Sequence, residues 1–151
     1  MSKFFNPQTA QPTSNGDAES ARLFAPATER NRSVIRDVMT QHLDGLRGTL
    51  VEVASGTGEH AVHIAPHLPN IMWQPTDIEA RHLDSINAWR THTGCNNILP
   101  AKHFNVIDND FPDISQGAHI CAVAAMNLIH IAPWRAAENL IEKAGICIKD
   151  G

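Results

Sequence analysis

One short segment, Leu50–His60, constrains this chain more than any other. An apolar run with β-branched residues ends in the small-residue sequence ASGTG (54–58), and a helix-type pattern follows at once. This order predicts a strand, a tight turn and a helix whose free N-terminal N–H groups face a ligand. The next apolar run ends in Asp77, where a carboxylate can bind ribose hydroxyl groups. Together these features predict a site for a nucleotide-type cofactor.

Composition limits the possible partners. The chain has 151 residues, of which 19% are charged, and its formal net charge is −4. Nucleic-acid binding needs clustered Lys and Arg, so we expect no nucleic-acid partner. The longest apolar run, residues 120–126, is far shorter than the ~20 residues that cross a bilayer. No apolar core of signal-peptide type follows Lys3, so we expect a cytoplasmic protein without a membrane partner.

Strand-type and helix-type segments alternate after an irregular N-terminal arm, residues 1–20, which is rich in Pro, Gln, Asn, Ser and Thr. The predicted strands are 49–54, 71–76, 98–106 and 119–126, and the predicted helices are about 27–46, 58–67, 79–93 and 133–146. This alternation suits right-handed βαβ crossovers. It predicts the α/β class, with a doubly wound and mainly parallel sheet.

The glycine turn fits two cofactor patterns. Residues 56–61 match the relaxed dinucleotide pattern GxGxxA, and residues 52–58 match an acid followed by x-G/A-x-G-x-G. Glu52 favours the second pattern, because an acid near the strand exit repels a pyrophosphate but suits the ammonium group of S-adenosylmethionine. Asp77 would accept both ribose hydroxyls. It is also a reasonable N-cap for the next helix, and the two roles compete for the same oxygens.

The sequence VEVASGTGEHAVHIAPHLPNIMWQPTDIE, with LDSINAW and AAMNLIHIAPW further on, resembles an uncharacterised methyltransferase-like family that includes methyltransferase-like protein 26. The resemblance covers about residues 21–151 and extends to the upstream sequence LFAPATERNRSVI. It implies a class I S-adenosylmethionine-dependent methyltransferase with no settled substrate. It implies cofactor contacts at Glu52, Ser55, Gly56, Gly58, Asp77, Asn105 and Asn127.

The chain departs from this family in two places. It has Phe-Asn-Val at 104–106 where the family usually has Leu-Asp-Val, and Asn105 can still bind the adenine amino group through its carbonyl oxygen. It also stops before the family's remaining strands, so we expect residues 21–151 to be a partial Rossmann domain, truncated after about four strands. The strand at 119–126 would then be an exposed edge that invites pairing with another copy or a partner. Its apolar residues are Ile120, Ala122, Val123 and Ala125.

Two residues after that strand are candidates for catalysis. Asn127 and His130 lie where open α/β sheets bind ligands, and histidine is a common general base in enzymes. His130 is therefore a candidate base or substrate contact, although a loop histidine bonded to backbone fits equally well. His63 and His67 have the spacing of a metal pair, but no further ligand joins them in sequence, and we expect no metal.

Three functions remain open at this stage. The preferred function is a methyltransferase that uses S-adenosylmethionine and a small-molecule substrate. The alternatives are an NAD-dependent oxidoreductase and a non-catalytic cofactor-binding remnant.

Overall fold

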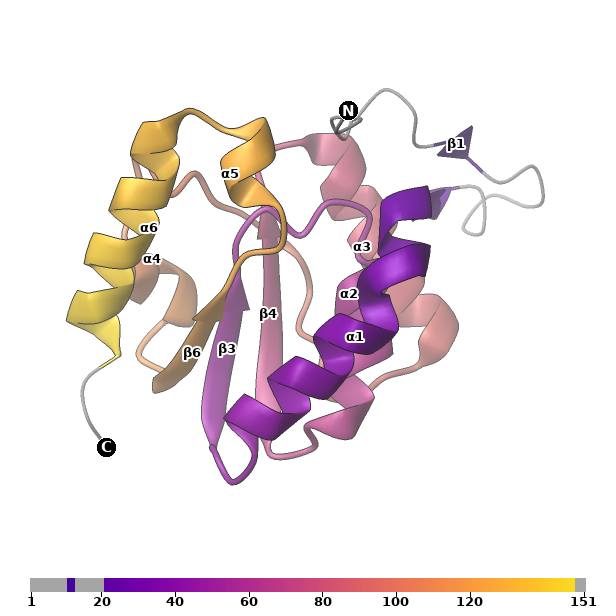
Figure 1. Cartoon of the computed structure of the whole chain (residues 1–151), viewed down its shortest axis with the longest axis horizontal. Helices are drawn as coiled ribbons and strands as arrows, with labels where there is room; N and C mark the ends of the chain where they lie inside the picture. Colours follow the sequence, from indigo (N-terminus) through magenta and orange to yellow (C-terminus); the bar gives the residue numbers. More distant parts are fainter. Residues whose placement is uncertain (1–10, 13–20, 149–151) are drawn as a thin grey trace.

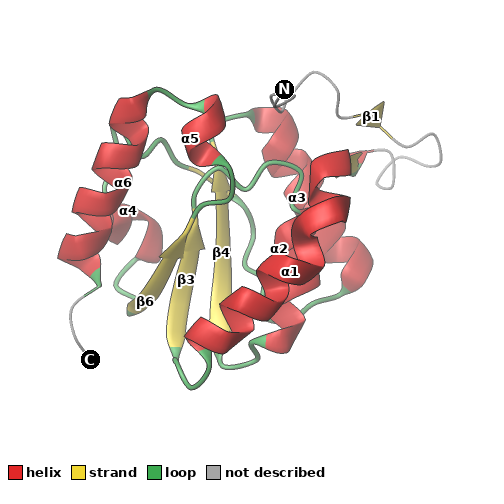
Figure 2. Ribbon diagram, viewed as in Figure 1, coloured by secondary structure: helices red, strands yellow, loops and turns green. Residues whose placement is uncertain are grey.

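A parallel sheet lies at the centre of the structure (Figure 2), in a computed structural model that describes residues 11–12 and 21–148. The strands are β3 (Gly48–Glu52), β4 (Ile71–Asp77), β5 (Lys102–His103) and β6 (Ile120–Ala124), in the order β5-β4-β3-β6. The predicted α/β class with a mainly parallel sheet is confirmed. Most of the predicted N-terminal arm lies outside the described residues, and the short strand β1 (Gln11–Pro12) pairs antiparallel with β2 (Leu23–Phe24).

Helices cover both faces of the sheet (Figure 1). One group consists of α1 (Pro26–Leu43), α2 (Glu59–Ile64) with the short 3₁₀ helix η3 (Ala65–His67), and α3 (Ala80–Thr93). The other group consists of α4 (Phe111–Ser115) and α6 (Trp134–Cys147), while α5 (Leu128–Ile131) lies near the carboxyl ends of the strands.

The core has two parts because side chains alternate along a strand. On β3, Leu50 belongs to the cluster packed with α1 and α2, and Val51 belongs to the cluster packed with α4 and α6. Both side chains are fully buried. Burial on both faces explains why β3 reads as a continuous apolar run rather than as an alternating one.

The predicted strand at 98–106 is wrong in extent. Only Lys102–His103 forms a ladder, and a single isolated bridge joins Trp73 to Ile98. Pro100 lies between these two pairings, and proline has no N–H group to donate to a ladder. The helices α4 and α5 were not predicted either, because each is too short to show a helical period.

The strand β6 ends the sheet, and among the described residues it pairs only with β3. Its apolar side chains are less exposed than expected, since Ile120 and Ala122 are buried and Val123 and Ala125 are half-buried. Contact with another chain through this edge stays a prediction. In the described part of the chain, no helix has the length and apolar character that a membrane span requires.

Candidate functional site

A cavity of about 410 Å³ lies at the carboxyl ends of the strands. Its walls come from the start of α1, the turn after β3, the end of β4, the loop after β5 and the segment around α5. The volume falls within the range of small-molecule sites, and open α/β sheets bind their ligands at this edge. Apolar side chains form most of the lining, with a few polar groups among them. The predicted position of the site therefore agrees with the position of the cavity.

Two glycines of the turn after β3, Gly56 and Gly58, have different surroundings. Gly56 has a φ of 63° and lines the cavity, and a Cβ atom there would have no neighbour within 4 Å. Gly58 has a φ of 91°, and a Cβ atom there would lie 2.9 Å from the Cα atom of Ile86 on α3. Gly58 does not line the cavity. The turn thus opens toward the cavity at Gly56 and packs against α3 at Gly58.

Ser55 joins the ends of β3 and β4. Its N–H group donates to the carbonyl oxygen of Thr76 over 2.9 Å, and its hydroxyl oxygen accepts from the Thr76 N–H group over 3.1 Å. The same hydroxyl donates to the carbonyl oxygen of Glu52 over 3.3 Å. Ser55 lines the cavity, but its hydroxyl is already engaged in holding the two strands together.

Glu52 does not line the cavity. Because side chains alternate along β3, Glu52 lies on the same face as Leu50, where its Oε2 atom accepts from the indole N–H group of Trp73 over 2.9 Å. The residue is 1% exposed, and its Oε1 atom has no hydrogen-bond partner among the described residues. Burial raises the pKa of Glu52 to about 7, although the bond from Trp73 opposes the rise. The structure thus leaves Glu52, like Gly58, outside the cavity wall, and its role toward a cofactor stays a prediction.

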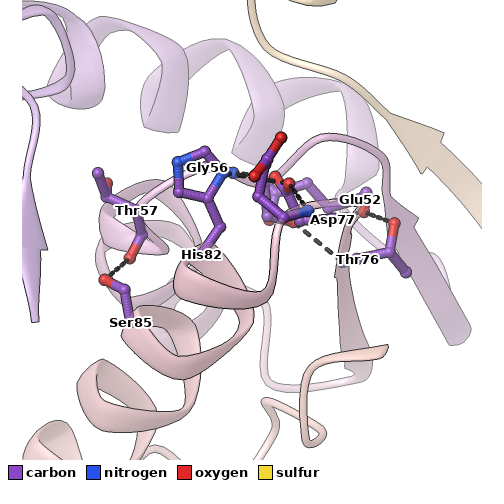
Figure 3. A network of polar contacts seen from close by, with 9 residues as sticks. Glu52, Gly56, Thr57, Thr76, Asp77, His82 and Ser85 are labelled. Atoms are coloured by element: carbon purple, nitrogen blue, oxygen red, sulfur yellow. Dashed lines mark hydrogen bonds and ion pairs between the residues drawn. The ribbon is translucent and has the colours of Figure 1, made fainter. Parts of the chain in front are cut away.

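Asp77 ends β4 and lines the cavity. Figure 3 shows its side chain beside Gly56 and His82. Its Oδ2 atom accepts from the N–H group of Gly56 over 2.9 Å. Its Oδ1 atom accepts from the N–H group of Glu79 over 2.9 Å and lies 3.1 Å from Nδ1 of His82. Burial alone would raise the pKa of Asp77, but these hydrogen bonds outweigh it and hold the pKa below its ordinary value. The cavity therefore has an ionised carboxylate at neutral pH.

Two cavity histidines were not predicted as site residues. His82, in the first turn of α3, is 5% exposed, and its Nε2 atom has no hydrogen-bond partner in the described chain. His60 is also buried, with Nε2 3.1 Å from Oδ1 of Asn31. Burial, with His63 and Arg32 adding to it, lowers the pKa of His60 to about 4, so its ring is neutral. The described residues contain no group of three His, Cys, Asp or Glu side chains that could hold a metal ion.

Asn105 lies in the cavity wall and also shapes the loop after β5. Its Oδ1 atom accepts from the N–H group of Ile107 over 3.0 Å, and its Nδ2 atom donates to Oδ2 of Asp108 over 2.9 Å. The two partners fix the orientation of the amide, because a carboxylate oxygen only accepts. One lone pair of Oδ1 remains for a ligand. Contact with an adenine amino group therefore stays a prediction that the geometry permits.

The two catalytic candidates lie in different environments. Asn127 precedes α5 with a left-handed backbone, φ 66°, and lines the cavity. His130 is exposed and does not line the cavity. Its backbone N–H group donates to the carbonyl oxygen of Asn127 over 3.1 Å. The structure thus brings Asn127 to the cavity and leaves His130 outside it.

A buried carboxylate attaches the start of α1 to the glycine turn. Oε2 of Glu59 accepts from the N–H group of Ala25 over 2.7 Å and from the hydroxyl of Thr57 over 2.8 Å. Burial raises the pKa of Glu59, although these two hydrogen bonds act to lower it. Ala25 and Thr28 complete one wall of the cavity. This wall could not be predicted, because it depends on contacts between segments far apart in the sequence.

Solved structures of methyltransferases share this fold. The crystal structure of coclaurine N-methyltransferase bound to N-methylheliamine and S-adenosylhomocysteine matches 90% of the chain at 12% identity, with a TM-score of 0.64. The CurJ carbon methyltransferase matches 75% at 19% identity, with a TM-score of 0.57. An O-methyltransferase family protein from Burkholderia thailandensis matches 82% at 18% identity, with a TM-score of 0.56. The chain thus has the Rossmann-like fold of methyltransferases.

The family is identified by sequence. The chain belongs to the family described as protein of unknown function DUF938, whose family model matches residues 22–151. The chain spans only 39%, 31% and 40% of the lengths of the three solved structures, in the order given. The narrower resemblance to proteins such as methyltransferase-like protein 26 stays a prediction.

Proposed function

We propose that this chain binds S-adenosylmethionine in the cavity and that it is part of a class I methyltransferase that acts on a small molecule. The observation that carries the proposal is the ionised, buried carboxylate of Asp77 in a cavity at the carboxyl ends of parallel strands. A carboxylate at this position suits the ribose of a nucleoside cofactor. The methyltransferase fold of the chain supports the same cofactor.

The lining residues fit such a ligand. Apolar residues, among them Phe104, Val106 and Leu128, suit an adenine ring, and the open turn at Gly56 lets a ligand approach the backbone. The negative charge of Asp77 suits a cofactor that is positively charged. When bound, S-adenosylmethionine supplies an electrophilic methyl group on sulfur. The contribution of the protein is then mainly to hold the donor and the acceptor together.

The NAD alternative has less support. The pattern GxGxxA would place a diphosphate over the N-terminus of α2. The carboxyl group of Glu59 lies in the first turn of α2, where an acidic group suits a diphosphate poorly.

The proposal extends to the organisation of the chain. We propose that residues 21–151 form the cofactor-binding part of a methyltransferase domain. In the described part of the chain, the residues that line the cavity lie between Ala25 and Ala136, while the matched structures are more than twice as long as the chain.

Calorimetric titration with S-adenosylhomocysteine, S-adenosylmethionine and NAD tests the proposal. We expect the two adenosyl ligands to bind and NAD to bind more weakly. The variant Asp77→Asn should weaken S-adenosylhomocysteine by roughly 10–100-fold, because a hydrogen bond to a charged group contributes about 1.5–3 kcal/mol. The matched control is Asp84→Asn, which changes an exposed aspartate on α3. Circular dichroism verifies that both variants fold.

Each other outcome selects another function. Tighter binding of NAD than of S-adenosylhomocysteine would favour the oxidoreductase. Binding of S-adenosylhomocysteine without methyl transfer to any acceptor in a small-molecule panel would favour the non-catalytic remnant. No binding of either adenosyl ligand would overturn the proposal.

A further inference from the structure

The hydrogen bonds of Asp77 limit what this carboxylate can offer a ligand. An ionised carboxylate has about four positions at which it accepts hydrogen bonds. Three are taken within the protein, by the N–H groups of Gly56 and Glu79 and by Nδ1 of His82. Among the described residues, two of these three donors share Oδ1, and only Gly56 donates to Oδ2. One accepting position is therefore left, and it is on Oδ2.

The bond between His82 and Asp77 is shielded from water. Both side chains are 6% exposed, and in a medium of low dielectric constant a hydrogen bond to a charged oxygen is stronger than in water. The carboxylate only accepts, so Nδ1 of His82 carries the shared proton. The remaining ring nitrogen, Nε2, is buried without a hydrogen-bond partner in the described residues, so no contact there competes with Asp77 for the ring. Together with the N–H group of Glu79, His82 therefore occupies both hydrogen-bond accepting positions of Oδ1.

We propose that His82 sets the hydroxyl selectivity of the cofactor site: it saturates Oδ1 of Asp77, so the carboxylate binds one ribose hydroxyl through Oδ2 instead of both. The inference rests on the proposed adenosyl cofactor and adds a residue that decides how many ribose hydroxyl groups Asp77 binds. His82 is a positioning residue here, since it acts on the ligand through Asp77. Sequence alone suggested that Asp77 accepts both hydroxyls.

The consequence is an unequal response to the two hydroxyl groups. Loss of the hydroxyl that Oδ2 accepts removes a hydrogen bond to a charged group and should weaken binding by about 10–100-fold. Loss of the other hydroxyl should weaken binding by less than about 3-fold, because no accepting position of Asp77 is left for it. A carboxylate with both oxygens free would respond to the two losses almost equally.

Calorimetry with S-adenosylhomocysteine and its 2′-deoxy and 3′-deoxy analogues measures this response. In the unmodified protein we expect one analogue to bind much more weakly and the other to bind nearly as well as the parent. In His82→Leu, which empties one position on Oδ1, both analogues should bind more weakly than the parent by at least about 5-fold. In His82→Asn the side-chain amide can donate to Oδ1 again, and the one-sided pattern should return.

The control is His67→Asn, an exposed histidine in η3 that does not line the cavity, and it should keep the unmodified pattern. Equal penalties for the two analogues in the unmodified protein would overturn the inference, whether or not the His82 variants fold. A one-sided pattern that persists in folded His82→Leu would overturn the role of His82 as well. Either result leaves cofactor binding in place, whereas failure of the parent ligand to bind would overturn the proposed function itself.

Discussion

Glu52 and Asp77 end two neighbouring parallel strands, and both are buried, yet they belong to different regions of the molecule. Glu52 belongs to a core side, where its carboxyl group has one donor, the indole of Trp73. Asp77 belongs to a cavity side, where three nitrogen donors surround it. The pKa of Glu52 is raised by burial, and the pKa of Asp77 is lowered by its hydrogen bonds despite burial. Burial alone therefore does not decide the charge of a carboxyl group, because the number of donors around it matters as much.

The same division runs through the glycine turn. Gly56 lies on the cavity side and donates to Asp77, while Gly58 lies on the core side against Ile86. Both have a left-handed backbone, so the sequence pattern treats them alike. What separates them is the contact that each would make with an added side chain. Substituting Gly56 and Gly58 in the same way therefore tests how far the cavity side and the core side of the turn differ.

The largest effect should come from the two glycines. Gly58→Ala should destabilise the protein by roughly 3–4 kcal/mol, since a left-handed alanine costs about 1–2 kcal/mol and its Cβ atom would overlap the backbone of α3. Gly56→Ala has the backbone cost alone and should lose about 1–2 kcal/mol. Denaturant unfolding measures both. Equal losses in the two variants would remove the distinction between the two sides of the turn.

The second effect is a dependence of stability on pH that comes from Glu52. Its pKa is about 7 in the folded chain and 4.5 ordinarily, so the folded state binds a proton that the unfolded state has released between these values. Its contribution to stability is therefore complete below about pH 4.5 and is lost as the pH rises through 7. The loss is on the order of 3 kcal/mol, because one pKa unit corresponds to about 1.4 kcal/mol.

Glu52→Gln removes this titration. The free energy of unfolding of the variant, minus that of the unmodified protein, should rise by on the order of 3 kcal/mol as the pH increases from 4.5 to 8. Urea unfolding at several pH values measures the difference, in which the titration of other groups cancels. A difference that stays constant with pH would contradict the raised pKa. The affinity of the variant for S-adenosylhomocysteine should differ from that of the unmodified protein by less than about 2-fold. A larger loss would mean that Glu52 contributes to cofactor binding.

The elements that sequence predicted well are those whose pattern is long enough to read. The segment from β3 through α2 and β4 to α3 has clear apolar runs, a glycine turn and a helical stripe, and its boundaries agree with the prediction to within a few residues. The strand near β5 was overestimated because Pro100 divides it. The helices α4 and α5 were missed because five and four residues make little more than one helical turn, too short for a repeating pattern.

The candidate site was predicted in part. Ser55, Gly56, Asp77, Asn105 and Asn127 meet at the cavity as expected, since the carboxyl ends of parallel strands share one edge. The direction of a side chain beyond a strand end is harder to predict. His82 could have been suspected, because it lies in the first helical turn after the acid that ends β4, but its bond to Asp77 depends on the tertiary path of α3.

The smallest effect concerns the two candidates that follow β6, one on the cavity side and one exposed. Asn127→Gly preserves the left-handed backbone while removing a side chain that lines the cavity, and it should weaken S-adenosylhomocysteine by about 5-fold, the equivalent of one neutral hydrogen bond of about 1 kcal/mol. His130→Ala should change that affinity by less than about 2-fold, because the ring of His130 lies outside the cavity. Calorimetry on both variants decides the comparison. A marked loss in His130→Ala would mean that α5 closes over the bound cofactor, and the histidine would then become a stronger candidate for catalysis than the asparagine.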